Sequence, residues 1–297
     1  MPIQVVTVPY RYDERGEGLG AGPSALLEKG LIERLQSVGL AIAGTSESEL
    51  ASQERVPGRR ALNIGRLGAA TARLVAGAVA EENRVLVLCG DDTASIGVLA
   101  GLQAMHGTGG TIGLIWLDAH GDFNTPETSY SGILAGMPVA ILAGLAGPRW
   151  RAEAGLTAPL ATDRIIIAGV RELDEKEEKL LRSTDTHVIS TKEVCEGESL
   201  RQAVDRLEGA TDCLWIHVDL DVLDPRHVPS ASTPAEDGLE IDELAQAMRL
   251  ILETGKVWAV SVAGLNPGAG TRGERSVKTT LTLLERALPA WGEAAGA

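Results

Sequence analysis

The sequence of 297 residues has few aromatic side chains and fewer basic than acidic residues. Aromatic residues make up only 3% of the chain while 44% of its residues are hydrophobic, so a core would be built mainly from Leu, Val, Ile and Ala. The net charge of −14 excludes nucleic acid as an expected partner, because binding to phosphates needs clustered Lys and Arg. The same charge argues against binding to an anionic membrane surface.

Cysteine is also scarce, and no segment has the pattern of a membrane span. Cys89, Cys195 and Cys213 show no CxxC spacing, which is typical of a reducing compartment rather than of a disulfide framework. The first residues, MPIQVVTVPYRYDERGEG, carry neither the basic segment nor the apolar run of a signal peptide. No apolar stretch approaches the roughly 20 residues that a membrane span needs. We therefore expect a cytoplasmic protein that does not bind membranes.

Short apolar runs alternate with longer Ala- and Leu-rich segments. The runs predict strands at 4–8, 84–88, 111–117, 164–168, 214–220 and 257–262, with weaker candidates at 39–44 and 186–190. The segments between them predict helices at 22–37, 61–82, 93–106, 174–182, 199–207, 241–253 and 273–288, with 143–160 as a connection. Apolar strands separated by helices indicate a parallel sheet covered on both faces. The sequence therefore predicts a single α/β/α domain over residues 1–297.

Acidic clusters follow three of the strongest predicted strands. They comprise Asp92; Asp118, His120 and Asp122; and Asp219 and Asp221. Alternate residues of an extended chain point to the same side, so the DxHxD and DxD patterns each aim their side chains at one spot. Because sites in open parallel sheets lie beyond the carboxyl ends of the strands, we expect all three clusters to meet at one edge.

Carboxylates held close together repel each other and need a compensating positive charge. Mixed carboxylate and imidazole ligands suit Mn²⁺ or a similar ion, and six ligands suffice for two ions with shared carboxylates. A lone DxD is a common turn. Two such patterns, each ending an apolar strand of the same chain, favour a metal site instead.

Several neighbouring residues have less specific patterns. His217 precedes Asp219 in the predicted strand, and we interpret it as a hydrogen-bonded core residue or a support for a ligand. Glu172 and Asp174 follow the strand at 164–168, where they either begin a helix or contact substrate. The glycine-rich GEGLGAGP is interpreted as a loop near the rim of the site rather than a nucleotide-binding loop.

The segments WLDAHGDFNTPETSYSG and WIHVDLDVLDPRHVPSASTP resemble the two signature segments of the ureohydrolases, the family of arginase, agmatinase and formiminoglutamase. PYRYDERGEGLGAGP, GVRELDEKE and LNPG are further matches, so the resemblance covers nearly the whole chain. It implies a three-layer α/β/α fold with an eight-stranded parallel sheet, two Mn²⁺ ions per chain and a homotrimer or homohexamer.

The resemblance also implies roles for individual residues. The implied metal ligands are Asp92, Asp118, His120, Asp122, Asp219 and Asp221. The metals would lower the pKa of a bridging water, and the resulting hydroxide would attack the central carbon of a guanidino-type small molecule. Asp122 and His120 would be the catalytic residues, with Asp122 passing a proton to the departing amine.

Substrate-binding positions are implied in the same way. Asn124 and Ser131 match residues that bind the α-carboxylate of an amino-acid substrate, and Asp174 matches one that binds its α-amino group. Glu172 and Thr233 are further candidates for contact with the substrate. This set favours an amino acid over agmatine.

Three positions depart from the pattern of the family. Asp92 stands where the first metal-binding histidine is usual, Ala135 replaces a histidine that acts in proton transfer, and Gly264 replaces a glutamate that pairs with the guanidinium. Asp92 as a non-histidine first ligand, and a small residue in place of the histidine after NTPETSYSG, are similar to the branch that hydrolyses Nω-hydroxy-arginine, whereas that branch is expected to retain the glutamate replaced here by Gly264. A hydroxyguanidine is less basic and needs less help from a paired glutamate and a proton shuttle.

The resulting hypothesis is a binuclear manganese hydrolase that cleaves a C–N bond of a guanidino or hydroxyguanidino amino acid and releases urea or hydroxyurea. Two alternatives stay open at this point. One is a hydrolase of a formimino compound or another amidine. The other is a catalytically degenerate, metal-binding subunit of the same family, which the losses at Ala135 and Gly264 would favour.

Overall fold

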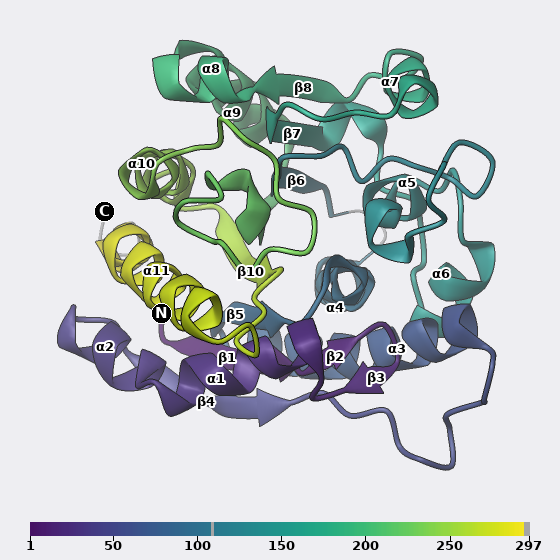
Figure 1. The fold of residues 1–297 in the computed structure, drawn as a ribbon, viewed down its shortest axis with the longest axis horizontal. Coiled ribbons are helices and arrows are strands. Elements are labelled where there is room, and N and C mark those ends of the chain that lie inside the picture. The colour runs from purple at the N-terminus through teal and green to yellow at the C-terminus, as the bar shows by residue number, and fades with distance from the viewer. Residues whose placement is uncertain (108–109, 294–297) are drawn as a thin grey trace.

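Eight parallel strands form the central sheet of the computed structural model, which describes residues 1–107 and 110–293. Their order is β4-β1-β5-β10-β9-β6-β7-β8 (Figure 1). The strands are β1 (Ile3–Val8), β4 (Ile42–Glu47), β5 (Arg84–Cys89), β6 (Ile112–Leu117), β7 (Ile165–Val170), β8 (His187–Ser190), β9 (Cys213–Asp219) and β10 (Val257–Ala263). An antiparallel ribbon of β2 (Tyr10–Arg11) and β3 (Glu14–Arg15) lies outside this sheet.

All eight predicted strands form, and the predicted three-layer α/β/α fold with an eight-stranded parallel sheet is confirmed. The strand predicted at 39–44 is displaced, because β4 begins only at Ile42. Gly39 has a φ of 91°, the left-handed conformation that commonly ends a helix. The preceding helix therefore ends just before this residue, and the chain becomes extended a few residues later.

Helices account for most of the remaining chain. They are α1 (Gly22–Glu28), α2 (Leu31–Ser37), α3 (Arg60–Ala80), α4 (Ser95–His106), α5 (Pro138–Leu142), α6 (Pro148–Ala154), α7 (Glu175–Leu181), α8 (Thr191–Glu196), α9 (Glu198–Ala210), α10 (Ile241–Leu252), α11 (Thr271–Ala287) and α12 (Pro289–Glu293). Five 3₁₀ turns are η1 (Gly18–Ala21), η2 (Asp92–Ala94), η3 (Leu134–Gly136), η4 (Thr162–Arg164) and η5 (Leu220–Val222). Within the described ranges, no helix is both long enough and apolar enough to cross a membrane.

Two features of the helices differ from the sequence prediction. The single helix predicted at 22–37 is divided into α1 and α2, because Gly30 between them has a φ of 82°. The sequence also does not predict α5, α6, α8 and α12, which have 5, 7, 6 and 5 residues. Such short helices do not contain enough turns for a 3.6-residue apolar repeat to be recognised.

Helices cover both faces of the sheet because successive strand residues point to opposite sides. Ile216 and Val218 of β9 belong to the cluster packed against α1, α2, α9, α10 and α11. Trp116 of β6 and Trp215 of β9 belong to the other cluster, packed against α3, α4, α5 and α6. Buried apolar residues on both sides therefore hold the sheet rigidly and fix the positions of its strand ends.

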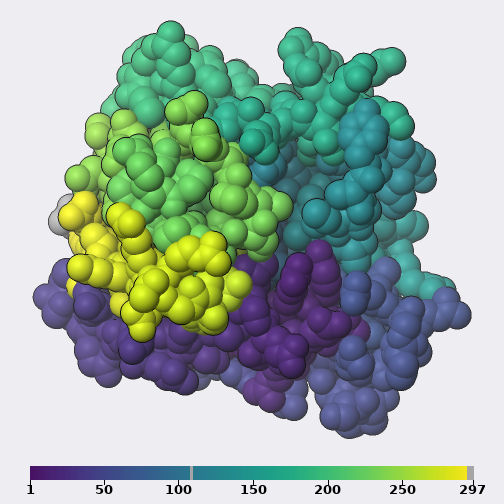
Figure 2. Space-filling view, viewed as in Figure 1, coloured from purple at the N-terminus to yellow at the C-terminus, as the bar shows by residue number. Residues whose placement is uncertain are grey.

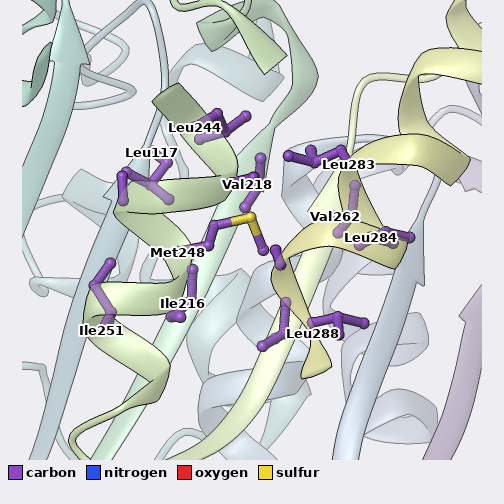
Figure 3. Packing of buried hydrophobic residues seen from close by; sticks show 14 of the residues in the cluster. Leu117, Ile216, Val218, Leu244, Met248, Ile251, Val262, Leu283, Leu284 and Leu288 are labelled. Atoms are coloured by element: carbon purple, nitrogen blue, oxygen red, sulfur yellow. The ribbon is translucent and has the colours of Figure 1, made fainter. Parts of the chain in front are cut away.

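Met248 is a buried member of the hydrophobic cluster that contains Ile216 and Val218. Figure 3 shows its side chain, from α10, pointing toward Ile216 and Val218 of β9, with Leu284 of α11 and Leu288, the residue after that helix, in the same cluster. All of these side chains are buried. Unbranched Met adapts to such an irregular space between two helices and a sheet.

Substitution of Met248 by Ala should therefore lower the free energy of unfolding by about 2–5 kcal/mol, since it leaves a cavity in the core. The matched control is Met105→Ala in α4, where 41% of the methionine is exposed. That change should stay within about 0.5 kcal/mol. Denaturant unfolding of both variants measures the difference, and equal losses would contradict this description of the core.

Candidate active site

The carboxyl ends of the adjacent strands β5, β10, β9 and β6 lie beside one cavity of about 650 Å³. Five of the six predicted metal ligands line it, namely Asp92, His120, Asp122, Asp219 and Asp221. The sixth, Asp118, contacts His120. On the face shown in Figure 2, the purple N-terminal segment, the teal segment after β6 and the green segment after β9 surround a hollow. The structure thus brings the three acidic clusters to one sheet edge.

Asp118, His120 and Asp221 form a compact candidate metal-binding group, whose potential ligand atoms all lie within 4.8 Å of one another. His120 Nδ1 is 3.3 Å from Asp118 Oδ1 and 3.2 Å from Asp221 Oδ2. Both carboxylates are buried. The imidazole therefore lies between two carboxylates that cannot be solvated by water in the usual way.

Backbone and side-chain donors fix the orientation of these two carboxylates. Asp118 accepts hydrogen bonds from Trp116 Nε1 at 2.8 Å and from the His120 N–H at 2.7 Å. Asp221 Oδ2 accepts one from Thr233 Oγ1 at 2.8 Å. Thr233, predicted to contact substrate, thus lines the cavity and also holds a candidate ligand.

The remaining acidic residues are also buried. Asp219 Oδ1 accepts the Asp221 N–H at 3.0 Å, and Asp92 Oδ1 lies 3.1 Å from His217 Nε2. Asp122 has a φ of 47°, and its Oδ2 atom is buried without a hydrogen-bond partner among the described residues. A buried carboxylate oxygen left unpaired is costly, so its position indicates that a ligand completes the site.

The electrostatics of the cluster show a shortage of positive charge. Burial raises the pKa values of Asp92, Asp122 and Asp219 well above the usual range, and repulsion between carboxylates adds to the shift. Burial also raises the pKa of Asp221 to about 6. Burial alone would lower the pKa of His120, but two adjacent carboxylates outweigh it and raise the value to about 12.

This donor set fits divalent metal ions. It combines several buried carboxylates, one imidazole and an unpaired carboxylate oxygen on Asp122. Oxygen-rich ligands with some imidazole suit a hard to borderline cation, and the cation would supply the charge that the cluster lacks. The six residues predicted from the sequence stay the candidates for holding such ions, and three of them form the compact group described above.

His217 is buried, as the sequence predicts, and it is hydrogen-bonded on both sides of its ring. Its Nδ1 lies 2.7 Å from Ser261 Oγ, opposite the contact between Nε2 and Asp92. Burial lowers the pKa of His217 to about 3, so the ring is neutral. It supports a carboxylate at the cavity without adding charge.

Four further predicted substrate-binding residues line the same cavity as the metal group. Asn124 Nδ2 donates to Asp174 Oδ2 at 3.3 Å, which joins two of them. Asp174 is also the N-terminal cap of α7, which confirms the helix-start interpretation, while its contact with substrate stays a prediction. Ser131 lines the cavity, and Glu172 lies with 59% of its side chain exposed near His120.

Sequence reasoning missed Glu177, which is buried beside the cavity. Its Oε1 accepts the Phe123 N–H at 2.8 Å. A Cβ atom at Gly121 would lie 2.8 Å from the same oxygen, so only glycine leaves room for this contact. The Asp174–Glu177 spacing of a capping box is the signal that could have identified it.

Arg171 is the other residue that the sequence interpretation missed. Its guanidinium donates to six backbone carbonyl oxygens, including Gly169 at 3.1 Å, Asp221 at 2.7 Å and Ala235 at 3.0 Å. It therefore links the segment after β7 to the segments around 221–223 and 235–236. Nothing in the local sequence distinguishes an arginine that binds carbonyl groups from one that is solvated.

Gly264 has a structural reason to be glycine. Its φ is 87°, and an added Cβ atom would lie 2.3 Å from Asp219 Oδ1. A longer side chain would need a different backbone at this position. Ala135, in η3, lines the same cavity and offers no titratable group.

The model of the family described as the Arginase family matches residues 1–289. The chain belongs to the arginase family. Arginase from Bacillus caldovelox is 32% identical over 275 residues, which cover 90% of this chain and 91% of that protein. The crystal structure of arginase from Bacillus subtilis is similar with a TM-score of 0.84 at 30% identity, covering 97% and 98% of the two chains. Formimidoylglutamase from B. subtilis, at 18% identity and a TM-score of 0.75 over 98% and 87% of the chains, shares the fold.

Membership of the arginase family confirms the predicted ureohydrolase resemblance and the predicted metal-dependent hydrolase of the ureohydrolase type. The structure of this arginase-family protein also contains a candidate metal-binding group. The identity and number of the ions, the roles of the site residues, the trimer or hexamer and the cytoplasmic location stay predictions.

Metal-free protein should lose thermal stability as the pH rises from 5 to 8. The folded-state pKa values of Asp221 (from 3.8 to about 6) and His120 (from 6.5 to about 12) are both raised. The folded chain therefore binds more protons than the unfolded one in this range, so its stability falls as those protons are removed. Thermal unfolding of chelator-treated protein measures the trend, and Mn²⁺ added at pH 8 should restore the midpoint. A midpoint that rises with pH in metal-free protein would contradict this account.

Proposed function

We propose that this protein is a binuclear manganese hydrolase that cleaves a C–N bond of a guanidino or hydroxyguanidino amino acid. One observation carries the proposal: a single cavity is lined both by the acidic cluster and by the linked pair Asn124 and Asp174. The cluster suits metal ions, and the pair suits the polar groups of an amino acid. The arginase relatives support this combination.

Asp118, His120 and Asp221 would hold one part of the metal centre, and Asp92, Asp122 and Asp219 the rest. Two Mn²⁺ ions, when bound, would balance the carboxylates and make hydroxide available as a nucleophile at neutral pH. The ligands are positioned in advance, because Asp118 and Asp219 each already accept a hydrogen bond from the backbone.

Asp122 is the residue best placed to move a proton. Its backbone is fixed, since its carbonyl oxygen accepts the Val139 N–H at 3.0 Å. Its unpaired Oδ2 would take a proton from the nucleophile and deliver it to the departing amine. The amine must be protonated as it leaves, because a free amide anion is not a possible leaving group in water.

A second group of lining residues would bind the amino-acid part of the substrate. Asp174 would pair with an ammonium group, while Asn124 and Ser131 would donate to a carboxylate. Asn124 is held in place, because its Oδ1 accepts the Thr128 hydroxyl at 2.9 Å and its Nδ2 donates to Asp174. Fixed donors of this kind lower the entropic cost of orienting the substrate.

Gly264 and Ala135 favour a hydroxyguanidine over a guanidinium. Position 264 cannot carry an acidic partner in its present backbone conformation. A full cation would therefore lose a partner in the cavity, whereas a less basic hydroxyguanidine would lose less. We accordingly propose Nω-hydroxy-arginine as the preferred member of the substrate class, with hydroxyurea as a product.

Purified protein should contain about two Mn²⁺ ions per chain and release urea or hydroxyurea. Metal analysis measures the first, and assays on arginine, Nω-hydroxy-arginine, agmatine, guanidino acids and formiminoglutamate measure the second. The variant Asp122→Asn also loses a carboxylate ligand, so it is assayed at saturating Mn²⁺; there it should lower kcat roughly 10²–10⁴-fold, as expected for loss of a general acid–base residue.

Other results would select an alternative function. Turnover of a formimino compound alone would identify an amidine hydrolase. Fewer than one ion per chain, with no turnover after manganese is added, would identify a degenerate subunit and sink the proposal.

Replacing Gly264 by Glu should not create an efficient arginase. The left-handed backbone costs a non-glycine residue roughly 1–3 kcal/mol, and the new Cβ would displace Asp219. We expect lower stability and weaker Mn²⁺ binding, measured by thermal unfolding and calorimetric titration. The control is Gly268→Glu in the same loop, where an added Cβ would meet only Asn266 Oδ1 at 3.5 Å. A gain of arginine turnover with unchanged metal binding would refute this interpretation of position 264.

A further inference from the structure

His217 lies in the middle of the sheet, directly below the acidic cluster. In the strand register it is paired with Trp116 of β6 on one side and Ser261 of β10 on the other. Its ring is stacked on the Trp116 indole, with centroids 3.7 Å apart and planes 18° from parallel. Stacking on Trp116 and full burial hold the His217 ring in one orientation.

The contact with Trp215 favours one direction for the hydrogen bonds around the ring. Trp215 Nε1 can only donate, and it does so to Ser261 Oγ at 2.8 Å. The Ser261 hydroxyl has two acceptors within reach, His217 Nδ1 at 2.7 Å and the Ile216 carbonyl oxygen at 3.4 Å, and the shorter contact favours donation to Nδ1. An imidazole nitrogen that accepts must leave the proton on the other nitrogen, so Nε2 carries the hydrogen.

That hydrogen points at Asp92. An ionised carboxylate only accepts hydrogen bonds, and a carboxylate that binds a metal must be ionised. His217 Nε2 therefore donates to Asp92 Oδ1, at 3.1 Å. Within the described residues no hydrogen bond involves Asp92 Oδ2, and Asp92 lines the cavity. Oδ1 of Asp92 is thus hydrogen-bonded to His217, and Oδ2 is available to bind a metal ion.

We propose that His217 is a positioning residue: by holding Oδ1 of Asp92 it presents Oδ2 as a ligand to one of the metal ions. This inference rests on the proposed metal centre and extends it to a residue that does not itself line the cavity. Hydrogen bonds connect Trp215 to Ser261, Ser261 to His217 and His217 to Asp92. Buried residues of the sheet thereby fix the orientation of the Asp92 carboxylate at the site. The imidazole supports the carboxylate without adding a positive charge.

The test is the variant His217→Phe, which keeps an aromatic ring against Trp116 but removes the donor. Metal-stripped protein is titrated with Mn²⁺ by calorimetry, and the paired-ion signal is followed by electron paramagnetic resonance. We expect one of two sites to weaken by about 10- to 100-fold, the usual effect of removing a hydrogen-bond partner of a ligand. The variant His217→Gln, which can restore an N–H donor near Asp92, should recover part of the affinity.

A double-mutant cycle separates positioning from a general structural role. If His217 acts through Asp92, then His217→Phe should have no further effect on Mn²⁺ affinity in protein that already carries Asp92→Ala. The control Ile216→Val changes the neighbouring residue on the opposite face of β9. It should cost about 0.5–1.5 kcal/mol of stability and leave Mn²⁺ affinity unchanged.

The outcomes are distinguishable. Unchanged affinity at both sites in His217→Phe, or an equal loss with and without Asp92, would overturn the positioning role while leaving the metal centre intact. Absence of Mn²⁺ binding by the wild-type protein would overturn both proposals. Should His217→Phe fail to fold, the same comparison is made with Ser261→Ala, and unchanged affinity in that variant would overturn the role.

Discussion

Repulsion among the buried carboxylates determines what the active site must bind. At an effective dielectric constant of 20, two unit charges 4 Å apart interact by about 4 kcal/mol. Several such pairs together would exceed the roughly 5–15 kcal/mol by which a domain is stable. The acidic cluster therefore exists only with bound cations or bound protons. The raised pKa values of Asp92, Asp122 and Asp219 express this same requirement in the metal-free chain.

The polypeptide itself supplies orientation to the cluster rather than charge. Among the described residues that line the cavity, only Arg11 and Arg171 have a permanent positive charge. Arg171 is directed toward backbone carbonyl groups rather than toward the carboxylates. The contacts that fix Asp118 and Asp92 come instead from the neutral donors Trp116 and His217. Charge compensation is thus left to exchangeable ions, while geometry is built into the sheet.

The sequence allows the fold and the location of the site to be predicted, because both follow from repeating patterns. Apolar runs ending in DxHxD and DxD indicate parallel strands whose carboxyl ends meet. Contacts between side chains from distant segments follow no such pattern. The donor from His217 to Asp92 joins residues 125 positions apart. Glu177 and the left-handed backbone at Gly264 likewise depend on packing that no local sequence specifies.

Arg171 has a consequence for how this site can change over evolutionary time. It ties together three segments beside the cavity entirely through main-chain oxygens, at residues 169, 221–223 and 235–236. Main-chain oxygens are present whatever the side chain. Substitutions in the wall can therefore accumulate without releasing the segments that carry them. Because these contacts do not depend on side chains, side chains that contact the substrate can change while the main chain around the metal centre keeps its position.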